Sequence, residues 1–351
     1  MKVVVVGASG NVGSSLLDRL SSESVVREVV AVSRRLPAGR FPKTTWVKSD
    51  ISADDISEHL RGADALVHLA WLIQPSRDIA YCRMTNVDGT RRLLDAAAQT
   101  EVPAVIYASS VGAYSAGPKD EAVDESWPTD GVPTSYYSVH KAETERMLDL
   151  FEADHPQVRV VRLRPGLIFK RSAASEIRRY FLGPLFPNLA LWPRFVPVVP
   201  SIERLRFQAV HTEDAARAYV RAILGEVRGP FNIAAEPVLE PPTLARSLHS
   251  LRVPVPARAV RAAAAASYRM RLHPTTPDWL DMALQVPVMD CTRAHEVLDW
   301  FPERSSIDAL TELLAGLRRG SGDPRFPPLV PDRWGMRLRE IAGGGPGARA
   351  A

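Results

Sequence analysis

The sequence predicts an α/β fold: a doubly wound parallel sheet followed by a smaller, mostly helical lobe. Three observations predict it. Short valine-rich runs, several of them apolar on both faces, recur through the first half, amphipathic stretches separate them, and the first run leads into a glycine-rich turn. Strands that are apolar on both faces belong to parallel sheets covered by helices, and a repeated strand–helix alternation indicates βαβ units.

The predicted strands come in chain order before residue 170. They are KVVVVG (2–7), EVVAVS (28–33), TTWVKS (44–49), DALVHLA (64–70), PAVIYASS (103–110) and VRVVRLRP (158–165). The predicted helices between them are NVGSSLLDRL (11–20), DDISEHL (54–60), the long stretch 77–100 and a helix that begins near 136. Ser135 stands immediately before that last helix, as an N-cap residue does.

The pattern changes after about residue 170, where prolines cluster. Helical stretches follow at 212–224, 258–272, 292–300 and 305–320, with short strand candidates RFQAV and GPFNIAA among them. We therefore expect a sheet core over 1–170, with sheet elements returning near 205–235, and a second lobe over 171–320. The extension 321–351 ends in GGGPGARAA and is expected to be partly disordered.

The composition is that of a soluble globular protein, with 46% hydrophobic and 24% charged residues and a net charge of only +4 among 351 residues. That charge does not favour a nucleic-acid partner. Two distant cysteines indicate a reducing compartment and no disulfide framework, and they lack metal-ligand spacing. The apolar segment 180–200 contains five prolines, so it is no membrane-spanning helix. We expect a cytoplasmic protein without a bound metal, a nucleic-acid partner or a membrane partner.

The first turn, GASGNVG, has the composition of a dinucleotide phosphate loop. Gly7 allows the tight turn, Gly10 lets the backbone approach a pyrophosphate, and Gly13 allows close helix–strand packing. Ser9, Asn11 and Val12 lie in the same turn and are expected to face the cofactor. A tight βα turn without a ligand is the alternative.

The second strand ends in Ser33, Arg34 and Arg35, where an NAD site would carry a carboxylate for the adenosine ribose. Two guanidinium groups suit a 2′-phosphate, so NADP is favoured over NAD. Arginines in a solvated turn are the alternative.

Tyr137 and Lys141 stand at i and i+4 of the helix after Ser135, so they share one face. Tyr136 pairs instead with His140 on another face, and it is assigned to packing or to the pocket wall. A stacked tyrosine beside a surface lysine is the alternative interpretation of the pair.

From Met1 to about Gly320 the chain resembles the extended short-chain dehydrogenase/reductase family, also called the NAD-dependent epimerase/dehydratase family. GASGNVG resembles its phosphate loop, and YSVHK resembles its Tyr-x-x-x-Lys motif. VHTEDAARA and TRAHEVLDWFP are similar to two signatures of its substrate lobe. The resemblance implies a Rossmann core and further cofactor-site residues in SDI, HLAW, NVDGT and the loop after the last strand: Asp50, Ile51, Ala70, Asn86 and Pro165.

The same resemblance implies a catalytic group. YASSVGAYS resembles the strand that delivers the catalytic serine, which is Ser110, with Ser109 as its structural neighbour. Tyr137 would act as acid or base, and Ser110 would hydrogen-bond the same substrate oxygen. Lys141, together with a positive nicotinamide ring, would lower the pKa of Tyr137, and Lys141 would also hold the nicotinamide ribose.

Three functions compete. The first is an NAD(P)-dependent oxidoreductase acting on a small, apolar secondary alcohol or ketone. The second is a sugar-nucleotide epimerase or dehydratase with tightly bound NAD, and the third is a non-catalytic NADP-sensing module. The third is disfavoured because Ser110, Tyr137 and Lys141 are all present.

The second function is weakened by two departures from the family pattern. Phe207 stands where sugar-nucleotide members carry an arginine, and RLRPGLIFKR lacks their asparagine. Phenylalanine, leucine, tryptophan and proline in 180–200 suit an apolar substrate, or equally burial against the main lobe or a second subunit. Trp71 is placed either at the substrate mouth or in the packing, His68 and His211 are assigned to structure, and a homodimer through the long helices is possible.

Overall fold

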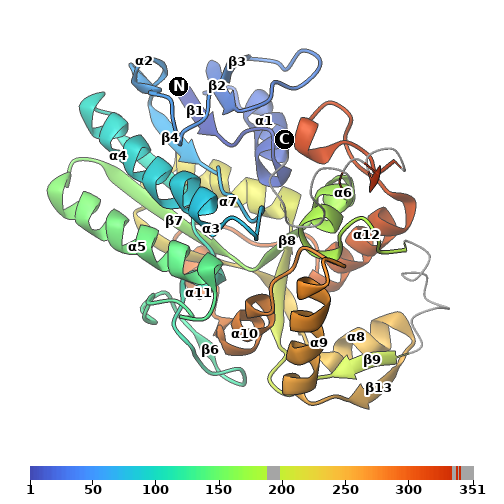
Figure 1. Cartoon of the computed structure of the whole chain (residues 1–351). Helices are drawn as coiled ribbons and strands as arrows, with labels where there is room; N and C mark the ends of the chain where they lie inside the picture. Colours follow the sequence, from blue (N-terminus) through green and yellow to red (C-terminus); the bar gives the residue numbers. More distant parts are fainter. Residues whose placement is uncertain (188–197, 334–336, 339, 341–351) are drawn as a thin grey trace.

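The centre of the molecule is a seven-stranded parallel sheet of order β11-β7-β5-β4-β1-β2-β3 (Figure 1). The computed structural model describes residues 1–187, 198–333, 337–338 and 340. The strands are β1 Lys2–Val6, β2 Glu28–Ser33, β3 Thr44–Lys48, β4 Ala65–His68, β5 Ala104–Ala108, β7 Arg159–Pro165 and β11 Gly229–Ile233. The doubly wound α/β fold expected from the sequence is confirmed.

Helices cover both faces of this sheet (Figure 1). α1 packs against α7 on one face, and α4 and α5 lie together on the other. The valines of β1 show why: Val3 and Val5 enter the core on the α1–α7 side, whereas Val4 and Val6 enter the core on the α4–α5 side. The covering helices are α1 Asn11–Ser22, α2 Ser57–Leu60, α3 Ile79–Arg83, α4 Gly89–Gln99, α5 Tyr136–Asp154 and α7 Thr212–Leu224.

Most of the chain after β7, together with β6, builds a lobe beside the sheet, along the right side and the bottom of Figure 1. Its helices are α6 Ala174–Ile177, α8 Pro241–Leu248, α9 Ala257–Arg269, α10 Asp278–Gln285, α11 Thr292–Glu296 and α12 Ser306–Arg319. Its short strands are β6 Ala122–Val123, β8 Leu167–Phe169, β9 Val198–Ser201, β10 Phe207–His211, β12 Ala235–Leu239, β13 Leu251–Pro254 and β14 Val288–Met289.

The chain returns to the main sheet through β11, which pairs with β7. β10 does not join that sheet, because it pairs with β8 and β12 in a separate three-stranded sheet. The two strand candidates near 205–235 therefore belong to different sheets.

Parts of two expectations fall on residues that the structure does not describe. They are residues 188–197 of the apolar segment 180–200, and residues 334–336, 339 and 341–351 of the extension. Within the described ranges, no helix has both the length and the apolar character that crossing a bilayer requires.

Candidate active site

The three glycines of the first turn meet three different demands. Gly7 has φ +86°, and a Cβ there would come within 2.5 Å of the Ala70 nitrogen at the end of β4. A Cβ on Gly13 would meet the backbone of Ala8 at 2.6 Å, so α1 could not pack this closely on the strand. On Gly10 a Cβ would meet only the Gly7 oxygen, at 3.6 Å. The protein itself therefore leaves space open at Gly10.

Gly10 is also the N-cap of α1, and having no side chain it leaves the first amides of that helix without a capping oxygen of its own. Helix N-termini of this kind bind phosphate. The loop is anchored to the sheet, since the Gly7 amide donates to the Val32 carbonyl at 3.0 Å. These residues fit the pyrophosphate of a dinucleotide.

The remaining loop residues are tied into the protein to different degrees. Asn11 is engaged on both sides of its amide, because Nδ2 donates to the Ile168 carbonyl at 3.1 Å and Oδ1 accepts from Thr212 at 2.9 Å. Its side chain thus joins the loop to β8 and α7. Ser9 is buried and Val12 is half-buried, so both leave mainly backbone for a ligand.

Arg34 and Arg35 lie exposed just beyond β2. Ser33 is buried and its hydroxyl donates to the Arg35 carbonyl at 2.8 Å, which fixes the turn. Arg34 donates to the hydroxyl of Tyr81 at 3.1 Å.

The sequence analysis did not single out two residues that lie near the start of α1 and Arg35. They are Lys170 and Glu176. The buried amino group of Lys170 donates to the Ser14 and Ser15 hydroxyls at 2.7 and 3.0 Å, in the first turns of α1. Burial raises the pKa of the Glu176 carboxyl, and the nearby charges of Lys170 and Arg35 oppose the shift. The cofactor end of the site thus holds more cations than the two arginines.

Ser110, Tyr137 and Lys141 are brought together where β5 ends and α5 begins. Ser135 caps α5, as expected, by accepting from the Ser138 amide. The Ser110 oxygen accepts from the Gly112 amide at 2.9 Å, and its hydroxyl is hydrogen-bonded to Tyr137.

The ring of Tyr137 packs on Gly112. A Cβ on Gly112 would come within 2.8 Å of the Tyr137 ring. The Tyr137 ring therefore leaves no room for a side chain at position 112, two residues after Ser110.

The lower pKa expected for Tyr137 depends on Lys141 together with a positive nicotinamide ring, and the structure shows what the protein alone contributes. Burial raises the pKa of Tyr137 to about 12, and the hydrogen bond with Ser110 only partly opposes the shift. Lys141 does share the helix face, but its amino group donates to the Ala108 carbonyl at 2.6 Å and to the Tyr107 hydroxyl at 3.3 Å. It also lies 3.5 Å above the Trp71 ring. Burial holds the pKa of Lys141 well below its usual value.

Glu145, one turn after Lys141, is a second residue that the sequence analysis missed. Its carboxylate is fully buried and accepts two hydrogen bonds from Arg164, both at 2.9 Å, and one from Arg162 at 3.1 Å. Ser109 donates to the same carboxylate, which agrees with a structural role for that serine. The group thus joins α5 to β5 and β7 beneath the catalytic residues.

Asn86 supports the site without facing it. Its side-chain amide forms two hydrogen bonds with the backbone of Leu72, at 2.7 and 2.9 Å, so it holds the loop after β4. Both ends of the amide are engaged with this backbone, which agrees with a supporting position in the cofactor site.

The other residues carried over from the family resemblance surround the same sheet edge. Ala70 is half-buried beside Gly7, and Ile51 is buried against Gly89. One oxygen of Asp50 accepts from Ser52, at 3.0 Å from its amide and 2.7 Å from its hydroxyl. Pro165 is buried at the end of β7, level with Ile233 of β11.

His68 and His211 both have structural roles, as expected. His68 is hydrogen-bonded to Thr90 at 2.8 Å, and burial lowers its pKa to about 3, so it is neutral. His211 caps α7 by accepting from the Glu213 amide at 3.2 Å.

Aromatic rings enclose Tyr137. The Trp71 ring lies 5.9 Å away edge-on, and the Trp279 ring of α10 lies 5.0 Å away. Phe181 packs on Trp279 at 4.9 Å. Tyr136, in contrast, turns away and donates its hydroxyl proton to the Ile73 carbonyl at 2.5 Å, so it belongs to the packing.

Among the described residues, no cluster of histidine, cysteine and carboxylate side chains has the arrangement of a metal site. The glycine turn, Ala70 and Ser110 follow the carboxyl ends of β1, β4 and β5, the edge where open parallel sheets bind their ligands.

Comparison with known proteins identifies the family. The sequence profile of the NAD dependent epimerase/dehydratase family matches residues 3–234. The chain is 26% identical over 321 residues to Rv2047c, an uncharacterized protein of Mycobacterium tuberculosis, and the match covers 91% of this chain but only 30% of that relative. It is 30% identical over 178 residues to a decarboxylating sterol-4-alpha-carboxylate 3-dehydrogenase of Candida albicans, covering 48% of this chain and 50% of the relative.

Among solved structures, the dTDP-glucose 4,6-dehydratase DesIV of Streptomyces venezuelae, with NAD bound, has a similar fold. The TM-score is 0.64 at 22% identity, and the likeness covers 92% of this chain and 99% of that one. The profile match extends over well more than half of the sequence, from β1 to the end of β11. The chain therefore belongs to the NAD-dependent epimerase/dehydratase family, a family of NAD-dependent enzymes of the extended short-chain dehydrogenase/reductase type.

Proposed function

We propose that this protein is an NAD(P)-dependent oxidoreductase that interconverts a secondary alcohol and a ketone on a small, apolar substrate. The aromatic enclosure of Tyr137 carries the proposal. Trp71, Trp279 and Phe181 leave a phenol among apolar rings, an environment that favours a hydrocarbon substrate with one oxygen function.

The arginines nearest to the expected phosphate-binding position support the same choice. Phe207 stands at that position, and its neighbours are already engaged. Arg204 donates to the carbonyls of Gly117 and Leu284 at 2.9 and 3.3 Å, while Arg206 is paired with Glu240 at 3.1 Å. A sugar-nucleotide pyrophosphate would have to break these contacts to gain a guanidinium partner.

The bound nicotinamide would supply the hydride acceptor or donor. The protein's own part is proton transfer and orientation. Because Tyr137 has a pKa near 12 and is protonated at neutral pH, it is prepared to donate a proton to the oxygen of a ketone. Ser110 accepts from the Gly112 amide and is hydrogen-bonded to Tyr137, so it would orient the phenol and meet the same substrate oxygen.

NADP is the favoured cofactor, since Ser33, Arg34 and Arg35 offer cations and no carboxylate at the end of β2. Lys170 adds a positive charge beside the first turns of α1. The whole site, including the roles of Ser110, Tyr137, Lys141 and the cofactor-loop residues, is part of this proposal.

A second candidate is the interconversion of a sugar nucleotide with tightly bound NAD. It is favoured by the family itself and by the dTDP-glucose dehydratase among the proteins of similar fold. The sterol dehydrogenase among the sequence relatives favours the first candidate.

The experiment compares Tyr137→Phe with Tyr136→Phe. The two variants make the same chemical change one residue apart, but only Tyr137 faces Ser110. With NADPH and a set of apolar cyclic ketones, we expect Tyr137→Phe to lose at least a thousandfold in kcat while its affinity for NADPH stays within a few fold. Tyr136→Phe should keep its kcat.

Thermal shift with NADPH, NADH and UDP-glucose then separates the two candidates. Strong stabilisation by UDP-glucose, together with no turnover of any ketone, would favour the second. Full activity of Tyr137→Phe would exclude the proposed acid in either reaction.

A further inference from the structure

Residues 241–277 of the C-terminal lobe have an unusual charge. The stretch contains six arginines and no aspartate or glutamate. All six arginine side chains are exposed: Arg246, Arg252, Arg258, Arg261, Arg269 and Arg271. These six positive charges, in about a tenth of the chain, exceed the net charge of +4 of the whole protein.

The same stretch exposes large apolar side chains. Leu251 is 73% exposed and Met270 is 68% exposed, and Val253 and Leu272 are exposed as well. β13 is exposed along its whole length, and α9 has no buried residue. Contiguous exposed apolar surfaces of this kind mark interaction sites.

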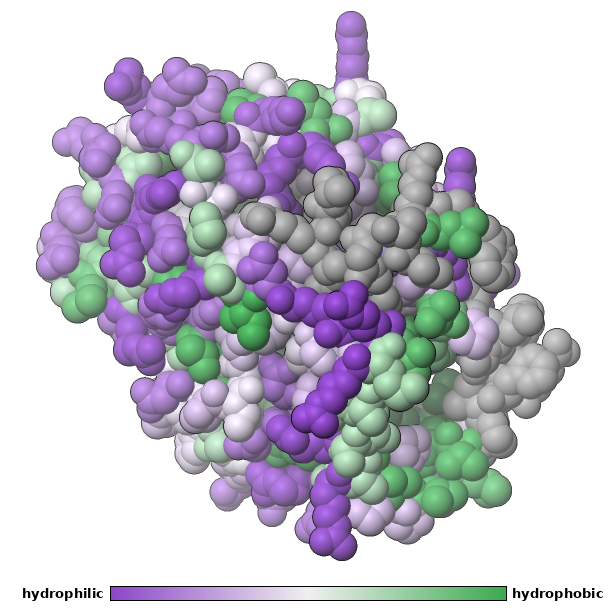
Figure 2. Space-filling model, in the orientation of Figure 1, coloured by the Kyte–Doolittle hydropathy of each residue, from purple (hydrophilic) through white to green (hydrophobic). Residues whose placement is uncertain are grey.

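The strand pairing makes the apolar part continuous. Leu251 lies level with Val198 of β9, and Val253 lies level with Pro200. Residues two apart on a strand share a face, so these four side chains form one apolar strip on the two-stranded sheet. In Figure 2 green surface gathers at the lower right, over β9 and β13, with purple side chains along α9 beside it.

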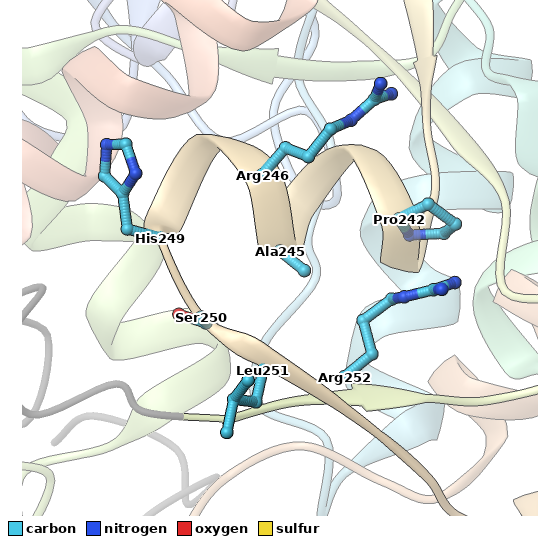
Figure 3. A pocket seen from close by; sticks show the side chains of 7 residues that line it. All are labelled: Pro242, Ala245, Arg246, His249, Ser250, Leu251 and Arg252. Carbon is cyan, nitrogen blue, oxygen red and sulfur yellow. The ribbon is translucent and has the colours of Figure 1, made fainter.

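An open groove of about 630 Å³ lies between α8 and β13. Arg246, His249 and Arg252 stand around it, with Pro242, Ala245 and Leu251 as its apolar lining (Figure 3). Cations next to an apolar floor suit a group that is charged at one end and hydrocarbon at the other.

We propose that this surface, formed by α8, β13, β9 and α9 and called here the arginine surface, docks on a bilayer of anionic phospholipid. The apolar strip would enter the headgroup boundary while the arginines bind lipid phosphates. Arginine presents a planar set of donors that matches a phosphate, and each basic residue close to an anionic membrane adds to the attraction.

Two other occupants fit less well. A second copy meeting this surface across a twofold axis would face six arginines with six arginines. A nucleic acid would use the arginines but not Leu251 and Met270. Tyr268, an aromatic ring of α9, is covered by the guanidinium of Arg77 at 4.0 Å, so it is not a stacking platform for bases.

The arginine surface is joined to the candidate active site. Tyr268 at the end of α9 donates to the Ser76 carbonyl at 3.2 Å, and Ser76 donates to the Pro274 carbonyl at 2.6 Å. The chain then continues into α10, whose Trp279 touches the Tyr137 ring. A membrane on this surface would lie on the same lobe as the aromatic wall of the site.

The sequence analysis expected no membrane partner because it considered only segments that span a bilayer. Peripheral binding needs no such segment, only an exposed apolar strip with cations around it. The inference does not depend on the proposed oxidoreductase function, because its test measures binding and not turnover.

The test is vesicle flotation of the full chain, with phosphatidylcholine vesicles that contain none or 30 mol % phosphatidylglycerol. We expect binding only to the anionic vesicles, weakened as salt is raised. Replacing Arg252, Arg258 and Arg269 by alanine should lower the partition coefficient on the order of a hundredfold, from the usual contribution of a basic residue near the surface. This variant leaves Arg261, which is paired with Asp281, in place.

The matched control replaces Arg27, Arg40 and Arg61, three exposed arginines outside the lobe, by alanine. The change in net charge is identical, so equal losses in both variants would overturn the proposal. A further variant, Leu251→Ser with Met270→Ser, keeps every charge and should lose at least tenfold in binding. The proposal would also be overturned if the wild-type protein did not float with anionic vesicles, or if the variant lacking Arg252, Arg258 and Arg269 still floated with them. Gel-shift binding to DNA at salt concentrations that abolish vesicle binding would overturn it as well.

Discussion

Replacement of Glu145 by glutamine tests the buried network beneath the catalytic residues. The carboxylate accepts two hydrogen bonds from Arg164 and one from Arg162, and all three side chains are nearly inaccessible to solvent. Although burial favours the neutral acid, Arg164 and Arg162 outweigh it and lower the pKa of Glu145 to about 2.

The magnitude follows in two ways. A shift from 4.5 to about 2 corresponds to about 3 kcal/mol of stability. Removing one partner of a buried ion pair usually costs about 3–5 kcal/mol, because the other charge stays buried. At about 2.1 cal/mol/K per residue, a loss of about 4 kcal/mol lowers Tm by roughly 5 °C for a chain of this length.

Glu143→Gln is the matched control. Glu143 lies on the same helix and forms its own two-point pair with Arg83, both contacts at 2.6 Å, but these side chains are 27% and 43% exposed. Such a pair contributes under about 1 kcal/mol. Calorimetry of both variants should therefore show a large fall in Tm for Glu145→Gln only, and equal falls would refute the reasoning.

The dependence of the unfolding free energy on pH in the acid range gives an independent check. The folded pKa of Glu145 is below its unfolded value, so its stabilisation is complete above about pH 4.5 and is lost as pH falls toward 2. The difference in unfolding free energy between wild type and Glu145→Gln should stay constant from pH 7 to 5 and then shrink. A difference unchanged at pH 3 would show that the ionised carboxylate is not its source.

Three further outcomes are expected. Gly13→Ala, whose Cβ would meet backbone at 2.6 Å, should lower Tm by several degrees, whereas Gly10→Ala should keep Tm but weaken NADPH binding by calorimetry at least tenfold. If the two variants lowered Tm equally, the open space inferred at Gly10 would be contradicted. Arg34→Ala with Arg35→Ala should raise the Kd of NADPH far more than that of NADH; equal losses would exclude a 2′-phosphate site there. In ultraviolet difference titration of the cofactor-free protein, Tyr137→Phe should match wild type up to about pH 11, since the pKa of Tyr137 is about 12.

The sheet and its helical layers could be predicted because their signals are local. Alternate valines of β1 enter the two cores on opposite faces of the sheet. In the turn that follows, glycine stands where φ is positive, at Gly7, and where a Cβ would not fit, at Gly13. The spacing of Tyr137 and Lys141 likewise fixes their common helix face. The pairing of β10 with β8 and β12 could not be predicted, because a five-residue apolar strand fits several sheets equally well.

Glu145 was missed because an acid in a helix usually faces water. A signal was nevertheless present in the strand that receives it. Arg162 and Arg164 are two residues apart in an otherwise apolar run, so they share one face of a strand that the pattern places inside the sheet. Charges at such positions require buried partners of opposite sign. Two arginines in a predicted inner strand therefore predict a buried acid in the covering helix.

The position of Lys141 changes the physical account of the tyrosine. A common helix face does not fix the direction of a long side chain, and here the Ala108 carbonyl and the Trp71 ring bind the amino group. Trp71 also packs edge-on against Tyr137, so one indole ring contacts both the amino group and the phenol. The protein alone keeps the proton on Tyr137 at neutral pH, because burial outweighs the hydrogen bond with Ser110. A phenol that stays neutral until the site is filled can donate its proton in reduction, whereas a phenolate present from the start could only accept one.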